Sequence, residues 1–173
     1  MSIKIDSNKM TALKEWIMEN KFRNPIQIGI ITDDLDKSIA YFKSILGIEP
    51  RAIADFPPEG YEDVYQEYKG KKGNSSGKFC FFDFGNIEIE IIYPVSGESV
   101  WKDFLDEHGP GLHHIKFSVA EHDESRAHLK KLGYDVYQGG AAVGKNAGKE
   151  WVYYNTFSEL GFDLEVMNEH IKK

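Results

Sequence analysis

Two stretches of this chain share the same order of predicted elements at nearly the same spacing, and this repeat limits the folds open to it. The apolar, β-branched run around Gln27 predicts a strand, and the helical pattern that follows it ends at Gly47. The run around His114 predicts a second strand, and its helix ends at Gly133. Gln27 lies 20 residues before Gly47, and His114 lies 19 residues before Gly133. We therefore expect two similar modules, in phase when Gln27 is laid over His114.

Further strands follow the helix in each copy, so the repeat predicts an α+β fold made of two βαβββ modules. The predicted strands are 26–32, 48–54, 64–68, 78–84 and 87–93 in the first module, and 113–119, 134–138, 149–155 and 162–167 in the second. The predicted division is an N-terminal extension (1–25, with a helix over 8–20), a first module (26–94), a connector (95–110, with a helix over 100–107) and a second module (111–173). The glycine-rich segment 139–148 indicates a loop.

Charge and cysteine content narrow the functional classes. The formal net charge of -7 argues against nucleic-acid binding. No apolar run approaches the length of a membrane span, and residues 1–6 lack the apolar stretch of a secretory signal. Cys80 lies in the apolar run 79–82, which favours a place in the core over a catalytic thiol. A lone cysteine forms no internal disulfide, so we expect a cytoplasmic protein.

Four polar side chains lie on predicted strands among apolar neighbours: Gln27, Glu90, His114 and Glu165. Burying a polar group without a partner costs roughly 2–7 kcal/mol, and a charge costs more. A metal ion would satisfy amide oxygen, carboxylate and imidazole together. Gln27 and His114 take the same place on the first strand of each module, and Glu90 and Glu165 the same place on the last. A pseudo-twofold between the modules would bring all four to one point.

The alternative is that the two carboxylates are solvated residues at strand edges. Glu88 and Asp163 each lie two residues from Glu90 and Glu165, on the same strand face, so pattern alone does not single out a ligand. Gln27 taken by itself is more often a hydrogen-bonded strand residue. Its register with His114 is the observation that favours a ligand.

Specific strings resemble the vicinal-oxygen-chelate superfamily, which includes glyoxalase I, methylmalonyl-CoA epimerase, extradiol dioxygenases and bleomycin-resistance proteins. The resemblance covers about Ile26 to Met167. Its most specific strings are Ile87-Glu88-Ile89-Glu90-Ile91-Ile92-Tyr93-Pro94, Phe104-Leu105 and Gly109-Pro110-Gly111-Leu112-His113-His114-Ile115, which look like the methylmalonyl-CoA epimerase signature. In that family the second histidine of the pair is a metal ligand, which maps to His114, and the other ligands map to Glu90 and to Glu165 on the final strand.

The resemblance implies a glyoxalase-like fold, in which a curved mixed sheet surrounds one divalent metal ion (Zn, Ni, Co or Mn). It implies a substrate that chelates the ion through two adjacent oxygens, such as an acyl-CoA or a thiol adduct, and a homodimer. Lewis-acid polarisation would acidify the neighbouring C–H and stabilise an enediolate or enolate. We expect Glu165 to move the proton as the catalytic base, with Glu90 as the second candidate.

Gln27 departs from the epimerase pattern, which usually has histidine there. The set of Gln27, Glu90, His114 and Glu165 resembles that of eukaryotic-type glyoxalase I, and it lacks the two histidines that extradiol dioxygenases place around iron. The leading hypothesis is an epimerase or isomerase of the methylmalonyl-CoA epimerase type. The alternatives are a glyoxalase I-like lyase and a non-catalytic, bleomycin-resistance-like binding protein.

The remaining polar features have structural interpretations. Strand alternation predicts that His113 points away from His114 and is structural. The other histidines (His108, His122, His128 and His170) are expected at the surface. The lysine-bearing segment 69–78 is expected to be a flexible, solvated loop rather than a phosphate site.

Overall fold

A computed structural model describes residues 22–120 and 122–168 of the chain. The strands are β1 Pro25–Ile31, β2 Ala52–Phe56, β3 Gln66–Tyr68, β4 Lys71–Lys72, β5 Ser76–Asp83, β6 Glu88–Ser96, β7 Gly111–Val119, β8 Gln138–Ala141, β9 Glu150–Tyr154 and β10 Asp163–Asn168. The helices are α2 Leu35–Leu46, α3 Val100–His108, α4 His122–Lys131 and α5 Phe157–Leu160, with a 3₁₀ turn at Gly144–Asn146. The helix expected over 8–20 lies outside the described residues.

Helix α2 is capped at both ends, and it ends where the sequence predicts. The Asp34 side chain accepts a hydrogen bond from the backbone N–H of Lys37, which satisfies one of the unpaired donors of the first turn. Gly47 takes a left-handed conformation (φ 68°), and its N–H donates to the carbonyl of Lys43. A side chain at position 47 would be strained in this conformation, so the glycine that ends the helix is a requirement of the backbone.

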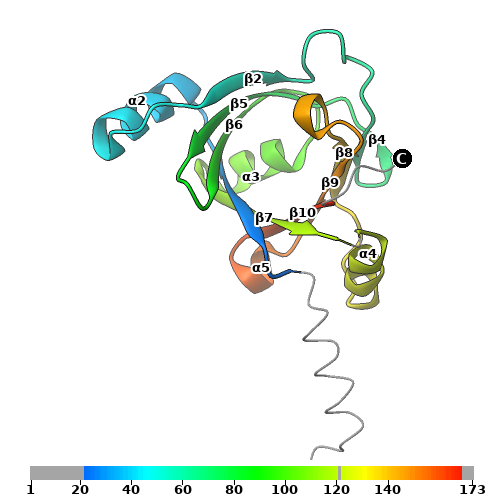
Figure 1. Ribbon diagram of the computed structural model, residues 1–173. Coiled ribbons are helices and arrows are strands. Elements are labelled where there is room, and N and C mark those ends of the chain that lie inside the picture. The colour runs from blue at the N-terminus through cyan, green and yellow to red at the C-terminus, as the bar shows by residue number, and fades with distance from the viewer. Residues whose placement is uncertain (1–21, 121, 169–173) are drawn as a thin grey trace, which may run out of the picture.

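All ten strands form one sheet, whose order is β2-β5-β6-β1-β7-β10-β9-β8-β3-β4. The antiparallel pair β1–β7 lies at its centre, and on either side a last strand of the repeat, β6 or β10, runs parallel to the first. From the centre outward, β6-β5-β2 mirrors β10-β9-β8. The sheet curls around α3 (Figure 1). The predicted curved mixed sheet of two βαβββ modules is thereby confirmed.

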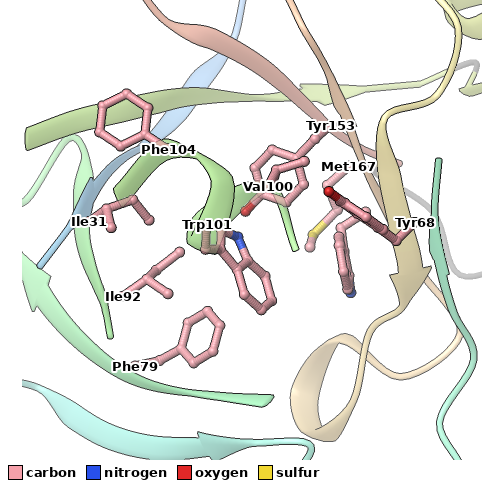
Figure 2. Packing of buried hydrophobic residues seen from close by; sticks show 10 residues of the cluster. Ile31, Tyr68, Phe79, Ile92, Val100, Trp101, Phe104, Tyr153 and Met167 are labelled. Atoms are coloured by element: carbon pink, nitrogen blue, oxygen red, sulfur yellow. The ribbon is translucent and has the colours of Figure 1, made fainter. Parts of the chain in front are cut away.

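Helix α3 lies in the hollow of the curled sheet and supplies the centre of the main core. Trp101 and Phe104 of α3 pack there against Ile31, Ile92 and Met167 from three different strands (Figure 2). Each large apolar side chain buried in this way contributes about 1.5–3 kcal/mol. The connector predicted between the modules is therefore part of the core.

The β3–β4 hairpin belongs to the first module by sequence but pairs with the edge of the second. β3 is antiparallel to β8, with Gln66 opposite Gly140. The hairpin is also fixed to α3, because Asp103 accepts hydrogen bonds from the hydroxyls of Tyr68 (2.6 Å) and Tyr137 (2.9 Å). The lysine-bearing segment 69–78 is therefore not the continuous loop that we expected, since it contains β4 and the start of β5.

Two other expectations differ from the structure, and one helix was not expected. The strand expected at 134–138 is instead β8, at Gln138–Ala141, within the predicted loop. Gly140 explains the error, since a Cβ there would lie 2.5 Å from the Trp151 ring, so this strand needs glycine for close packing. His122 was expected at the surface but is buried, at 4% exposure. The short helix α5 was not predicted.

No helix in the described part of the chain is long and apolar enough to cross a membrane.

Candidate metal centre

The centre of the sheet carries a row of polar side chains that comes from five adjacent strands. Backbone register places Gln27 of β1 beside Glu88 of β6 and Lys116 of β7. Glu165 of β10 then lies between Lys116 and Tyr153 of β9. Residues opposite each other in a ladder point to the same face. The row therefore faces the hollow of the sheet as a set.

A second row, two residues along, brings in the histidine. Register pairs Gly29 of β1 with Glu90 on one side and with His114 on the other. A Cβ on Gly29 would lie 1.8 Å from Cε1 of His114, so the imidazole lies directly over this glycine. Its Nε2 lies 3.4 Å from Oε2 of Glu90 and 3.0 Å from Oε2 of Glu165. Gly29 thus lets the imidazole reach both carboxylates.

The structure brings all four predicted ligands to this point. Glu90, His114 and Glu165 each offer one ligand atom, and these atoms lie within 4.8 Å of one another. The Gln27 amide joins them, because its Nε2 lies 3.4 Å from Oε1 of Glu90. All four side chains are buried, with exposures of 5% or less.

The donor atoms fit a cation. Four buried atoms have no hydrogen-bond partner among the described residues: Gln27 Oε1, Glu90 Oε2, His114 Nε2 and Glu165 Oε2. Buried polar atoms are rarely left unpaired in proteins, and three of these four, those of Glu90, His114 and Glu165, lie together. One nitrogen and three oxygens are a donor set that suits Zn, Ni, Co or Mn.

Neighbouring charges set the protonation of the site. Lys116 Nζ lies 3.1 Å from Oε1 of Glu165. Burial alone would raise the pKa of Glu165, but Lys116 and His114 lower it, so this residue is a carboxylate. Burial opposes the charged form of His114 as well, yet Glu165 and Glu90 raise the pKa of the imidazole. A cation at the site would therefore compete with the proton on His114.

Glu88 contributes no atom to the group formed by Glu90, His114 and Glu165. Its Oε1 accepts a hydrogen bond of 2.6 Å from Nε2 of Gln27, and its Oε2 pairs with Arg51. This contact orients the Gln27 amide so that Nε2 faces Glu88 and Glu90. Glu88 is therefore a positioning residue for Gln27, which separates it from Glu90 although both lie on one strand face.

Strand alternation predicted that His113 points away from His114, and this prediction is wrong. The pairing of β1 with β7 shifts register between Gly29 and Ile30, a β-bulge that leaves His113 without an opposite residue. Both imidazoles are consequently buried, with their Nδ1 atoms 3.0 Å apart. His113 Nε2 also lies 3.5 Å from Asp163. His113 therefore contacts the candidate ligand His114 directly.

A cavity of about 430 Å³ opens beside these residues. Its walls are largely aromatic, from Phe56, Phe79, Trp101, Trp151 and Tyr153. Ligand-binding pockets commonly have such walls: the aromatic rings contact the apolar part of a ligand, and a few polar groups orient it.

Sequence reasoning missed three residues of this region. Gly29 was visible as a glycine inside an apolar strand, which indicates close approach of another group. Lys116 was visible as a charge between Ile115 and Phe117, the same signal that singled out Glu90. Tyr153 gave no signal, because a tyrosine in a strand is ordinary.

Comparisons with known proteins agree with the geometry. Residues 26–154 match the family model described as the Glyoxalase/Bleomycin resistance protein/Dioxygenase superfamily. The chain is 27% identical to human mitochondrial methylmalonyl-CoA epimerase over 105 residues, which cover 60% of this chain and 51% of that protein. It is 26% identical to an ethylmalonyl-CoA/methylmalonyl-CoA epimerase of Cereibacter sphaeroides over 114 residues (65% of this chain and 73% of that protein).

The fold is shared with solved structures. Methylmalonyl-CoA epimerase from Mycobacterium tuberculosis superposes with a TM-score of 0.57 at 20% identity, covering 87% of this chain and 91% of that one. At this identity the likeness concerns the fold. The matched part of the chain spans about half the length of the human relative.

Proposed function

This chain belongs to the glyoxalase/bleomycin resistance/dioxygenase superfamily, and from that membership we propose that it is a metal-dependent enzyme that transfers a proton next to a carbonyl. The proposed activity is an epimerisation or isomerisation of the methylmalonyl-CoA epimerase type. The relatives that carry that name support the choice of reaction.

One observation carries the proposal. Three ligand atoms, from Glu90, His114 and Glu165, converge within 4.8 Å in a buried site, with the imidazole between the two carboxylates. Burying two carboxylates and an imidazole together costs free energy unless a partner compensates their charge. A divalent cation held by these three residues and by Oε1 of Gln27 accounts for all four unpaired atoms.

The chain's own residues would perform the proton transfer. When bound, the ion supplies Lewis-acid polarisation of a substrate carbonyl. Glu165 is the proposed base: Lys116 holds its Oε1, and its carboxylate would take the proton once Oε2 is released from the ion. Glu90 is the second acid–base group, as an epimerisation needs one on each face of the carbon. The aromatic walls exclude water from the reacting carbon.

The substrate that fits this proposal is an acyl-CoA. Its acyl head would reach the polar rows, and the aromatic walls of the 430 Å³ cavity would hold the apolar part next to the thioester. Assembly as a homodimer and a cytoplasmic location stay predictions from the sequence.

A second candidate is a glyoxalase I-like lyase that acts on a thiol adduct. Gln27 favours it, because the resemblance implies an amide, two carboxylates and one imidazole for that enzyme. Gln27 lies in the site with Oε1 unpaired. A non-catalytic binding protein, the third alternative, has no use for four converging donor atoms.

The test is α-proton exchange. Protein loaded in turn with Zn, Ni, Co or Mn is incubated with racemic methylmalonyl-CoA in deuterated water, and α-deuterium is followed by mass spectrometry, with chelator-treated protein as the control. We expect metal-dependent incorporation. Metal-loaded protein that exchanges no α-proton but converts a hemithioacetal would identify the lyase instead. Protein that takes up no metal and shows no thermal shift with any of the four would favour the binding protein.

A further inference from the structure

We propose that His113 is a positioning residue: its Nδ1 accepts a hydrogen bond from Nδ1 of His114 and thereby leaves Nε2 of His114 free to bind the metal ion. The inference rests on the proposed function, because it concerns the orientation of a metal ligand. It gives a role to a buried histidine that belongs neither to the ligand set nor to the proton transfer.

Neighbouring rings fix the orientation of His113. The side chain is fully buried, at 0% exposure. Its ring lies edge-on to Phe104, with centroids 5.0 Å apart, and 5.6 Å from the ring of Tyr153. Close packing of this kind leaves a side chain few other rotamers. The two ring nitrogens of His113 therefore have set neighbours, which are Asp163 at Nε2 and His114 at Nδ1.

Asp163 determines which nitrogen of His113 carries the proton. Its Oδ1 accepts the backbone N–H groups of Thr156 (2.9 Å) and Phe157 (3.1 Å), and its Oδ2 lies 3.5 Å from Nε2 of His113. A carboxylate has no proton to donate, so its negative charge favours an N–H at the nitrogen that faces it. Burial lowers the pKa of the His113 imidazole, so the ring is neutral. The proton is therefore on Nε2, and Nδ1 has a free lone pair.

The tautomer of His113 in turn sets that of His114. The two Nδ1 atoms lie 3.0 Å apart. Because Nδ1 of His113 is the acceptor, Nδ1 of His114 is the donor. Nε2 of His114 then faces Glu90 at 3.4 Å and Glu165 at 3.0 Å. An imidazole that donates through Nδ1 presents the lone pair of Nε2, which is the form that binds a divalent cation.

His113 itself is not placed to be a ligand. Its Nδ1 faces His114 and its Nε2 faces Asp163. Neither atom belongs to the group formed by Glu90, His114 and Glu165. A residue that only filled space would need the volume of the ring but not its nitrogens. The positioning role and the space-filling role therefore predict different effects when single nitrogens are replaced.

Three substitutions separate these roles, because an amide side chain reproduces one ring nitrogen at a time. His113→Asn keeps an acceptor near the position of Nδ1, next to His114. His113→Gln keeps a polar atom near Nε2, next to Asp163, but removes the acceptor for His114. His113→Phe keeps the ring and removes both nitrogens. His108→Asn is the matched control, since His108 packs against the same Phe104 ring, with centroids 4.9 Å apart, and lies on α3 rather than on a ligand strand.

Two measurements are made on each protein, after circular dichroism has checked folding. Cobalt affinity is titrated by visible absorption. Nitrogen NMR of zinc-loaded, ¹⁵N-labelled protein records which ring nitrogen of His114 is protonated and which one binds the metal. A change in packing alone would not alter that assignment.

We expect His113→Phe and His113→Gln to lose cobalt affinity by about 10–100-fold, while His113→Asn and His108→Asn stay within about threefold of wild type. In zinc-loaded wild type, Nδ1 of His114 should carry a proton protected from exchange with water, and Nε2 should bind the zinc. His113→Asn should retain this protected proton. In His113→Phe the proton should exchange with water, because its acceptor is gone.

Asp163→Asn tests the same contact from the other end and leaves position 113 intact. Its Oδ1 still accepts the two backbone N–H groups, but an NH₂ donor now faces Nε2 of His113. His113 must then carry its proton on Nδ1, where it meets the N–H of His114. Cobalt affinity should fall by about tenfold or more.

The results that overturn the inference are distinct from those that overturn the proposed function. If His113→Phe binds cobalt as wild type does, or better than His113→Asn, the role of His113 is to fill space, and the metal centre stands. Zinc-loaded wild type with its metal on Nδ1 of His114 would also overturn the inference, and this result needs no variant to fold. If wild type binds neither cobalt nor zinc, the proposed function itself fails.

Discussion

Gly29 and His114 face each other across the ladder between β1 and β7, and the imidazole fills the place of the missing side chain. A Cβ on Gly29 would lie 2.3 Å from Nε2, which is the atom directed at Glu90 and Glu165. Glycine weakens the interior of a strand, so its presence here needs a cause. The cause is that any other residue would place a Cβ where the His114 imidazole lies, so only glycine lets the ring reach both carboxylates.

Gly29→Ala should therefore displace the imidazole and weaken metal binding. We expect a loss of about 10–100-fold in cobalt affinity, the range seen when the orientation of a ligand is lost. Gly111→Ala is the matched control, because Gly111 is on the same strand as His114. A Cβ there would lie 3.9 Å from the nearest atom, in the Phe104 ring, which is an ordinary contact. Cobalt titrations of both variants make the comparison. Equal affinities would show that His114 does not hold the ion.

Glu165→Gln tests the assignment of the base. An amide is similar in shape to a carboxylate but does not accept the proton, so α-deuterium exchange should fall by about 10²–10⁴-fold. Glu90→Gln should retain exchange at the face served by Glu165. The measurement is exchange by mass spectrometry with metal content determined in the same samples. A Glu165→Gln protein that holds its metal and exchanges at the wild-type rate would contradict the assignment.

The repeat made the fold and the candidate ligands predictable. Laying Gln27 over His114 set β1 against β7, and the same phase set Glu90 against Glu165 on β6 and β10. This worked because alternation along a strand and symmetry between modules are both properties of the sequence.

What could not be predicted depends on contacts between distant residues. No local sequence feature indicates that β3 pairs with β8, or that a β-bulge turns His113 toward His114. Lys116 carried the visible signal of a charge inside an apolar strand, but its partner, Glu165, lies on another strand. In each case the information lies in the pairing of strands rather than in either strand alone.

Cys80 was predicted to lie in the core, and the structure confirms this, since the residue is fully buried. Burial raises the pKa of its thiol to about 11. The thiolate is the reactive form, so native protein at pH 8 should not react with a thiol reagent such as dithionitrobenzoate, while protein unfolded in guanidinium should react at once. Rapid labelling of the native protein would contradict the buried position.

Asp103 offers a test of how the β3–β4 hairpin is held to α3. Its carboxylate accepts hydrogen bonds from Tyr68 and Tyr137 and pairs with Lys69 at 3.0 Å. Burial acts to raise the pKa of Asp103, but these three partners lower it overall. Because the folded-state pKa lies below the unfolded value, this stabilisation is present above the unfolded value, about 3.9, and is lost as the pH falls through the folded value.

Asp103→Asn should therefore cost about 1 kcal/mol of unfolding free energy at pH 7, a modest value because the side chain is partly exposed to solvent. The difference from wild type should shrink as the pH is lowered below about 4, where the wild-type carboxyl also becomes protonated. Urea denaturation of both proteins at several pH values measures it. Asp106→Asn is the control, since Asp106 lies on the same helix and pairs with Lys102 at the surface. A difference between Asp103→Asn and wild type that stays constant down to pH 3 would show that the Asp103 charge does not hold the hairpin.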